Sequence, residues 1–222
     1  MKTTKPANAL PPLFALLALA LAFAAPARAA IIDPFIRAGV DTTKLNAVSK
    51  IRDDSSWKDK LNGWNASYFV EAGVTLLGSH TLGIEAGYMK ADGSTSATED
   101  GIQSRTQIPL LLNYRHTFNL GPVGIYLGLS AGMMSDTAKW RADVTGASKN
   151  FKSGNWIGVY GATAGVALKL GSHWAVDLGV RALAVSQKQY QDTSSPDSEN
   201  YKIGDSGVYI RPNLRLALAY RW

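Results

Sequence analysis

The sequence contains no cysteine and only three histidines in 222 residues. The missing cysteine excludes a disulfide scaffold, a cysteine-ligated metal, a cysteine nucleophile and a lipid-modified N-terminal cysteine. So few histidines argue against a transition-metal site, and we expect no metal and no cofactor. Charged residues make up 18% of the chain, below the roughly 25% of soluble domains. Beyond the first thirty residues the clearest apolar run is only Ile108–Leu112, which excludes a helical membrane protein.

The first 29 residues have the organisation of a secretory signal peptide. Lys2 and Lys5 form a basic start, an apolar run covers 13–25, and Ala27-Arg28-Ala29 is a small-residue cleavage site. The alternative is an N-terminal anchor that stays attached. We therefore expect a signal peptide at residues 1–29 and a mature domain at residues 30–222. Loss of the signal peptide lowers the net charge from +6 to +3. With export and no basic cluster, this charge argues against a nucleic-acid partner.

Alternation of apolar and polar residues dominates the mature chain. Between Trp64 and Leu77 every even position is apolar or aromatic, and most odd positions are small or polar. A period of two is typical of β-strands, because successive side chains point to opposite faces. The pattern recurs and predicts eight strands, at residues 36–41, 64–77, 82–89, 105–118, 123–133, 160–170, 174–182 and 208–222.

The connections between these strands alternate in length. Three are short turns, at 78–80, 119–122 and 171–173, and four are long polar segments, at about 44–63, 91–104, 135–155 and 186–206. A four-residue turn should reverse the parity of the apolar positions, and it does so between Phe118 and Val123. The alternation predicts an antiparallel up-and-down meander, with both ends of the chain on the side of the short turns.

The polar face of the predicted strands carries six charges near mid-strand. Periodicity alone also allows a soluble sandwich or a lipocalin-like barrel, which would bury the apolar face and expose these charges. Aromatic residues cluster at both ends of the apolar face, however, as in the girdles of transmembrane barrels. In such a barrel the charges face the lumen, and we expect a structural ion-pair network there, with a gated or narrow polar pore as the alternative. The six residues are Glu71, Glu85, Arg115, Asp177, Arg181 and Arg215.

The last strand alternates up to an aromatic final residue, through Leu214, Leu216, Leu218, Tyr220 and Trp222. This stretch resembles the C-terminal assembly signal of bacterial outer-membrane β-barrels. The mature chain resembles small barrels of the OmpA/OmpX and opacity-protein type. The resemblance implies insertion by the barrel-assembly machinery into the bacterial outer membrane, among its lipids and lipopolysaccharide. We therefore predict an all-β, eight-stranded antiparallel up-and-down transmembrane β-barrel, whose lumen is just wide enough for side chains.

Enzymes of similar architecture need residues that this sequence does not bring together. Outer-membrane lipid A deacylases use a His and a Ser on the lipid face, but the same-face neighbours of His116 supply no nucleophile. His80 and His173 directly follow serines in turns, where we expect neighbouring side chains to diverge. The membrane palmitoyltransferase barrel uses loop His, Asp and Ser, and loop 44–63 has no His. Omptin-type proteases need a larger barrel. We expect no enzyme.

The four long loops are the expected functional surface, because loops on a rigid scaffold carry recognition. Loops 44–63 and 135–155 each carry a net charge of +2, which suits either an extracellular ligand or the phosphates of lipopolysaccharide. We expect a non-enzymatic surface protein with a structural, adhesive or host-interaction role, and a narrow pore for small solutes is the alternative. Pro109 and Pro212 fall inside strands, and we expect a bulge or water at the barrel rim to compensate for their missing N–H donors.

Overall fold

A computed structural model describes residues 32–44, 64–92, 101–144, 147–188, 190–191, 202–203 and 206–222. The expected signal peptide and most of the expected long loops lie outside these residues. Eight long strands form the molecule: β1 (Ile32–Lys44), β2 (Trp64–Leu76), β3 (His80–Asp92), β4 (Gly101–Leu120), β5 (Val123–Val144), β6 (Ala147–Leu170), β7 (Trp174–Gln187) and β10 (Gly207–Arg221). The short strands β8 (Tyr190–Gln191) and β9 (Lys202–Ile203) pair with each other. Within the described ranges, no helix is long and apolar enough to cross a membrane.

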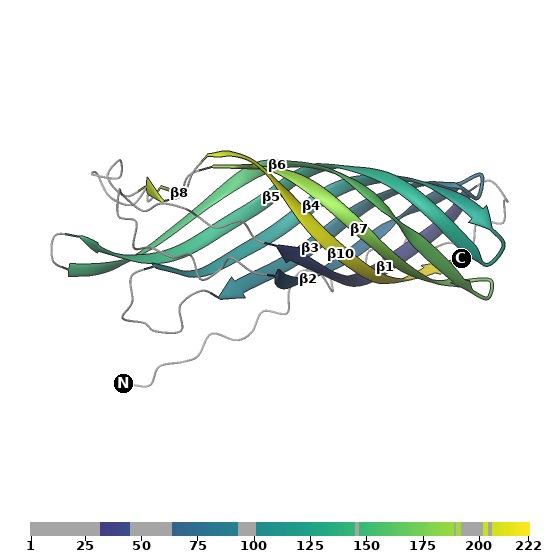
Figure 1. Ribbon diagram of the computed structural model, residues 1–222, viewed down its shortest axis with the longest axis horizontal. Coiled ribbons are helices and arrows are strands. Elements are labelled where there is room, and N and C mark those ends of the chain that lie inside the picture. The colour runs from purple at the N-terminus through teal and green to yellow at the C-terminus, as the bar shows by residue number, and fades with distance from the viewer. Residues whose placement is uncertain are drawn as a thin grey trace, which may run out of the picture.

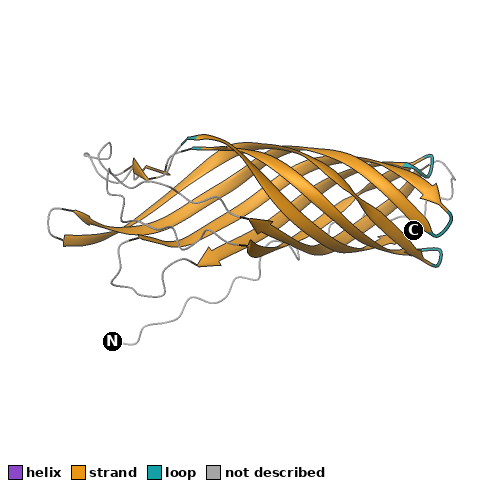
Figure 2. Cartoon of the chain, in the orientation of Figure 1, coloured by secondary structure: helices purple, strands orange, loops and turns teal. Residues whose placement is uncertain are grey.

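The eight long strands close into one antiparallel barrel (Figures 1 and 2). Each strand pairs with its neighbours in the chain, and β1 pairs with β10 to complete the ring, with Ala38 opposite Leu218. Closure gives every strand two partners, so no strand edge faces lipid. The predicted eight-stranded up-and-down barrel is confirmed.

Most of the large apolar side chains in the middle of the barrel point outward. On β7, for example, Leu178 is 63% exposed whereas the adjacent Asp177 is 4% exposed. The outward face of the barrel is therefore an aliphatic band, and the inward face is mostly polar and charged. This is the reverse of a water-soluble barrel, and it requires an apolar solvent around the molecule.

Three short turns connect β2 to β3, β4 to β5 and β6 to β7, and we call this side the turn end. Each turn contains a glycine with positive φ, at Gly78, Gly121 and Gly171, a backbone region that costs glycine little. The opposite side, where β1, β3 and β7 end, is called the loop end. Figure 1 shows the N-terminal start of β1 and the C-terminus at the turn end, as the predicted meander requires.

The expected loop at 135–155 is wrong, because most of it is β-strand. β5 and β6 stay paired as far as Val144 and Ala147, and this hairpin projects beyond the rest of the barrel (Figure 1). Alternation continues there, with Asp136 and Ala138 buried, but the outward partners Thr137 and Lys139 are polar. An outward position above the membrane need not be apolar. The alternation of apolar and polar residues, from which the strands were predicted, therefore ends before the strand does.

The two prolines interrupt pairing without a bulge. The β3–β4 register steps from Ala86↔Leu110 to Met89↔Gln107 with no change of offset, so Pro109 removes ladder bonds but inserts no residue. Pro212 lies just beyond the last β1–β10 pair and still pairs with Ala182 of β7. The expected bulge is therefore absent at both prolines.

Candidate functional site: the filled lumen

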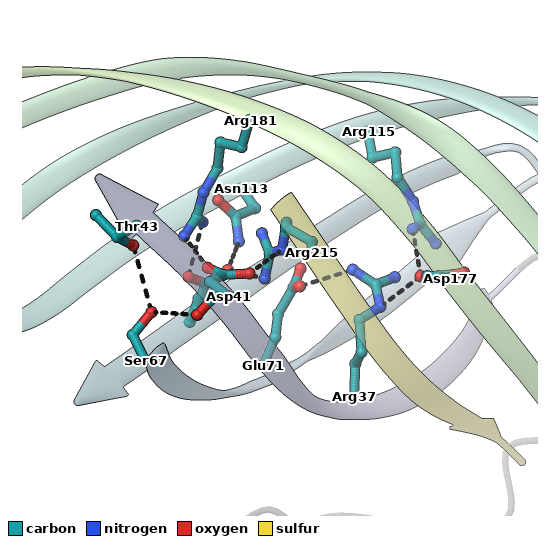
Figure 3. A network of polar contacts seen from close by, with 11 residues as sticks. Arg37, Asp41, Thr43, Ser67, Glu71, Asn113, Arg115, Asp177, Arg181 and Arg215 are labelled. Atoms are coloured by element: carbon teal, nitrogen blue, oxygen red, sulfur yellow. Dashed lines mark hydrogen bonds and ion pairs between the residues drawn. The ribbon is translucent and has the colours of Figure 1, made fainter. Parts of the chain in front are cut away.

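A network of charged side chains lies inside the barrel (Figure 3). Among the described residues it contains four arginines and four carboxylates, contributed by β1, β2, β3, β4, β7 and β10: Arg37, Asp41, Glu71, Glu85, Arg115, Asp177, Arg181 and Arg215. Each is less than a tenth exposed. The equal numbers make the network electrically neutral, as buried charges require.

One part of the network lies nearest the turn end. Arg37 contacts Glu71 at 2.7 Å on the adjacent strand and Asp177 at 2.9 Å across the lumen. Arg115 contacts the same Asp177 at 2.7 Å. The four side chains form a chain of contacts in which two carboxylates meet two guanidinium groups.

The other part is a closed set of four ion pairs. Arg181 contacts Asp41 at 2.6 Å and Glu85 at 2.8 Å, and Arg215 contacts the same two carboxylates at 3.1 Å and 2.9 Å. Asn113 donates a further hydrogen bond to Glu85 at 2.9 Å. Glu85 lies directly opposite Glu71 in the β2–β3 ladder, a repulsive arrangement that the arginines reaching across the lumen neutralise.

The structure places all six sequence-predicted charges in this network. It adds Arg37, Asp41 and Asn113, which the sequence interpretation did not single out. The alternation could have placed these three residues in the lumen. Arg37 and Asp41 occupy the polar positions of the expected strand at 36–41, and Asn113 lies on the same face of its strand as Arg115. The function of the network, as a structural plug or as a pore lining, stays a prediction.

Aromatic rings pack against the guanidinium groups. Arg115 lies over the ring of Tyr126 at 4.5 Å, and Arg215 lies over Phe69 at 3.9 Å. Tyr126 has room because Gly165 and Gly179 are paired opposite each other on β6 and β7, and a Cβ at either position would collide with its hydroxyl group.

Towards the loop end the lumen becomes apolar and then polar again, as the inward residues of β7 show. Asp177 and Arg181 are followed by the buried Leu183 and Val185, and then by the buried Gln187. Leu183 and Val185 belong to a cluster that also contains Leu111, Met134, Ile157 and Val159. An apolar cluster in the lumen excludes hydrated ions, because ions lose their hydration there without compensation.

A second polar layer lies beyond the apolar cluster. Arg105 makes a two-pronged ion pair with Asp136, at 2.9 and 2.6 Å. Arg211 donates to the side-chain oxygens of Gln107 and Gln187, at 3.0 and 3.3 Å. The sequence interpretation missed this layer, because three of its five members lie outside the predicted strands or near their ends.

Two of the cavities bordered by network residues are small. They have volumes of about 30 Å³ each, one beside Arg37 and Arg115 and one beside Asp41 and Arg181. A volume of this size holds a single water molecule. Several buried nitrogen and oxygen atoms lack a partner, among them Arg115 Nε and Asp177 Oδ1, and isolated waters would satisfy them.

The predicted assembly-signal residues lie on the outward face of β10. Leu214, Leu216 and Leu218 are about half exposed. Tyr220 packs edge-on against Trp174 and Trp222, with ring centroids 4.9 and 5.2 Å apart. The arrangement gives the turn end a lipid-facing aromatic cluster, and the role of this stretch in assembly stays a prediction.

The histidines differ from expectation in one respect. Ser172 and His173 do not diverge, because Ser172 Oγ lies 2.6 Å from His173 Nδ1. The imidazole stacks on Tyr220, with centroids 5.7 Å apart. On the other side of the barrel, His80 Nδ1 lies 2.8 Å from the Tyr114 hydroxyl group, and the ring of His80 contacts that of His116. Within the described ranges no group of three potential ligands could hold a metal.

Comparison with known proteins identifies the family of this filled barrel. The chain matches the family described as outer membrane protein beta-barrel domain over residues 15–208, and it belongs to that family. It is a protein of the bacterial outer membrane. No curated protein matches the sequence.

The chain is similar to several solved structures of outer-membrane proteins. The crystal structure of Neisserial surface protein A is 13% identical, with 86% of this chain and 97% of that chain covered and a TM-score of 0.50. Ail of Yersinia pestis, crystallised with the heparin analogue sucrose octasulfate, is 11% identical, with 86% and 99% covered and a TM-score of 0.49. Outer membrane protein H of P. aeruginosa is 17% identical, with 86% and 99% covered and a TM-score of 0.44. At such identities the likeness concerns the fold alone.

Proposed function

We propose that the protein is a closed, non-enzymatic barrel that acts at the cell surface, in adhesion or host interaction, through the chain segments at its loop end. The observation that carries this proposal is the filled lumen. A neutral ion-pair network, an apolar cluster and a second polar layer follow one another along the barrel, and the two cavities beside the network have room for single waters. This geometry favours a scaffold over the narrow pore.

The loop end offers a surface for recognition. The β5–β6 hairpin continues beyond the other strands, and its outward face carries Lys139 directly opposite Lys152, both exposed. Like charges directly opposite each other destabilise a ladder, which favours an anionic partner at this position. Long loops of outer-membrane barrels face the outside of the cell, so we propose that lipopolysaccharide phosphates or an extracellular ligand meet this hairpin.

Adhesion of cells that display the protein tests the proposal. A laboratory bacterium without adhesins would carry the wild-type protein or a variant in which an Asn-Gly turn joins Thr137 to Gly154, a paired position on the hairpin. The matched control is Leu216→Val, on the lipid face. We expect the wild type and the control to increase binding to epithelial monolayers, and the shortened variant to return to background. Wild-type cells that bind no better than cells without the protein would contradict the proposal.

A further inference from the structure

A groove of about 600 Å³ crosses the outward face of β4, β5, β6, β7 and β10. Directly paired residues line it in two adjacent rows that run across the strands, and one row extends from His116 on β4 to Leu214 on β10. The rows face outward, with Leu214 54% exposed, so the groove lies outside the filled lumen. The other row consists of Tyr114, Leu129, Ala162, Ala182 and Pro212.

Small side chains in the middle of the rows form the floor of the groove. Ala162 of β6 pairs directly with Ala182 of β7, and Ala164 follows Ala162 on the same face of β6. On either side the outward side chains are larger, with Leu129 on β5 and Leu214 on β10. Small residues let a neighbouring molecule in the membrane approach the backbone closely. The groove therefore leaves room for a partner within the apolar band.

The β4 end of the groove is polar. The Tyr114 hydroxyl group lies 2.8 Å from His80 Nδ1, and the ring of His80 contacts that of His116 with centroids 4.6 Å apart. His116 Nδ1 is buried, and it has no hydrogen-bond partner in the part of the chain that the structure describes. A polar atom that is shielded from water without a partner costs free energy. A polar group of a bound molecule would remove this cost.

The polar end lies closer to the turn end than the rest of the groove does. Tyr114 is six residues from the turn end of β4, whereas Pro212 is nine residues from the turn end of β10. Short turns of outer-membrane barrels face the periplasm. The groove therefore starts near the headgroups of the periplasmic leaflet and continues into the hydrocarbon region of the membrane.

An amphipathic lipid matches this change from polar to apolar. Its ester and phosphate oxygens accept hydrogen bonds from imidazole N–H groups, and its acyl chain gains dispersion contacts on the alanine floor. A second copy of the barrel fits less well, because its outward face is as convex as the face that carries the groove. We propose that the groove binds one phospholipid of the periplasmic leaflet, with its headgroup at His80 and His116 and one acyl chain over Ala162 and Ala182.

Photo-crosslinking in vesicles tests this site. The mature protein would be refolded into phosphatidylethanolamine vesicles in which some lipids carry a diazirine on an acyl chain, and labelled peptides would be identified by mass spectrometry. The test variant is Ala162→Leu with Ala182→Leu, which fills the floor. The matched control is Ala38→Leu with Ala86→Leu, on the outward faces of β1 and β3. We expect the wild type and the control to label β6 and β7 severalfold more strongly than β1 and β2, and the test variant to label both faces equally.

Two further measurements separate the headgroup from the chain and the lipid from a second barrel. Diacylglycerol with the same diazirine chain lacks the phosphate headgroup, and we expect it to label the groove more weakly. His116→Phe should lower phospholipid labelling to the diacylglycerol level, while heat-modifiable migration on gels shows a folded barrel.

Four results would overturn the proposal. The first is equal labelling of the two faces in the wild type, and the second is undiminished labelling of the groove in the folded test variant. The third is diacylglycerol that labels the groove as strongly as the phospholipid does. The fourth is wild-type barrels that cross-link to each other through the groove, because a second copy would then be the occupant.

Discussion

At the scale of single residues, each buried charge of the lumen depends on a partner from a distant part of the chain. Arg181 holds Glu85, 96 positions earlier, and Asp41, 140 positions earlier. Within the part of the chain that the structure describes, Arg115 forms an ion pair with Asp177 alone, and Arg37 also contacts Asp177. Removal of one partner leaves an uncompensated buried charge, so the cost should follow the number of contacts that each arginine makes.

Arginine-to-alanine substitutions test this ranking. We expect Arg181→Ala and Arg215→Ala each to lower the free energy of unfolding by about 3 kcal/mol, and Arg115→Ala by about half as much, because it loses one contact instead of two. Urea unfolding in lipid vesicles, followed by heat-modifiable migration, would measure the loss. The control is Leu216→Val, which faces lipid and should change the urea midpoint little. Arginine variants that unfold at the wild-type midpoint would show that the network does not stabilise the barrel.

At the scale of elements, β10 has two separate tasks. On its inward face, Arg211 belongs to the second polar layer and Arg215 belongs to the ion-pair network. Its outward face ends at the aromatic cluster around Tyr220. The same strand closes the barrel by pairing with β1 and β7. A change at the end of β10 should therefore affect assembly more than stability, because the Trp222 ring packs against Tyr220 on the outward side.

Replacement of Trp222 tests the predicted assembly signal. We expect Trp222→Asp to reduce the amount of folded protein in the outer membrane severalfold, because the aromatic end of the last strand is lost to the assembly machinery. The same variant, refolded from urea into vesicles, should form a barrel with nearly wild-type stability. Trp174→Asp, at the same interface but on β7, is the control. Normal outer-membrane yield of Trp222→Asp would contradict the prediction.

Alternation in the sequence predicted which face of each strand is polar, but it could not predict partners or strand ends. Parity placed Glu85, Arg115 and Asp177 inside the barrel. The pairing of Arg115 with Asp177 depends on the curvature and register of the closed barrel, which no local pattern contains. The hairpin beyond residue 135 was missed because its outward residues lie above the apolar band and no longer need to be hydrophobic.

At the scale of the whole molecule, the two ends of the barrel differ in chemistry. The turn end has short glycine turns and an aromatic cluster. The loop end has the projecting β5–β6 hairpin (Figure 1), on which Lys139 stands opposite Lys152. Between them the lumen is filled by two polar layers and an apolar cluster. This asymmetry is consistent with a barrel whose turn end faces the periplasm and whose loop end faces the outside of the cell.

Labelling of intact cells tests the orientation. Single cysteines would replace Ser55, in the sequence between β1 and β2, and Thr145, in the sequence between β5 and β6. Two more would replace Ser79 and Ser172 in the short turns. The wild-type chain has no cysteine, so each label reports one position. We expect a membrane-impermeant maleimide to react at the first two positions, and at Ser79 and Ser172 only after the outer membrane is permeabilised. The reverse pattern would invert the orientation and remove the proposed recognition surface.

The central claim is that the barrel is closed, and single-channel recording tests it most directly. The mature protein would be refolded and inserted into planar bilayers at high salt. We predict no stable conductance steps above the bare-bilayer background, because the ion-pair network and the apolar cluster leave no continuous water path. Arg181→Ala should open brief, irregular steps at most. Stable steps in the wild type, with an ion selectivity that changes in Arg115→Ala or Arg215→Ala, would contradict the closed barrel and establish the narrow pore.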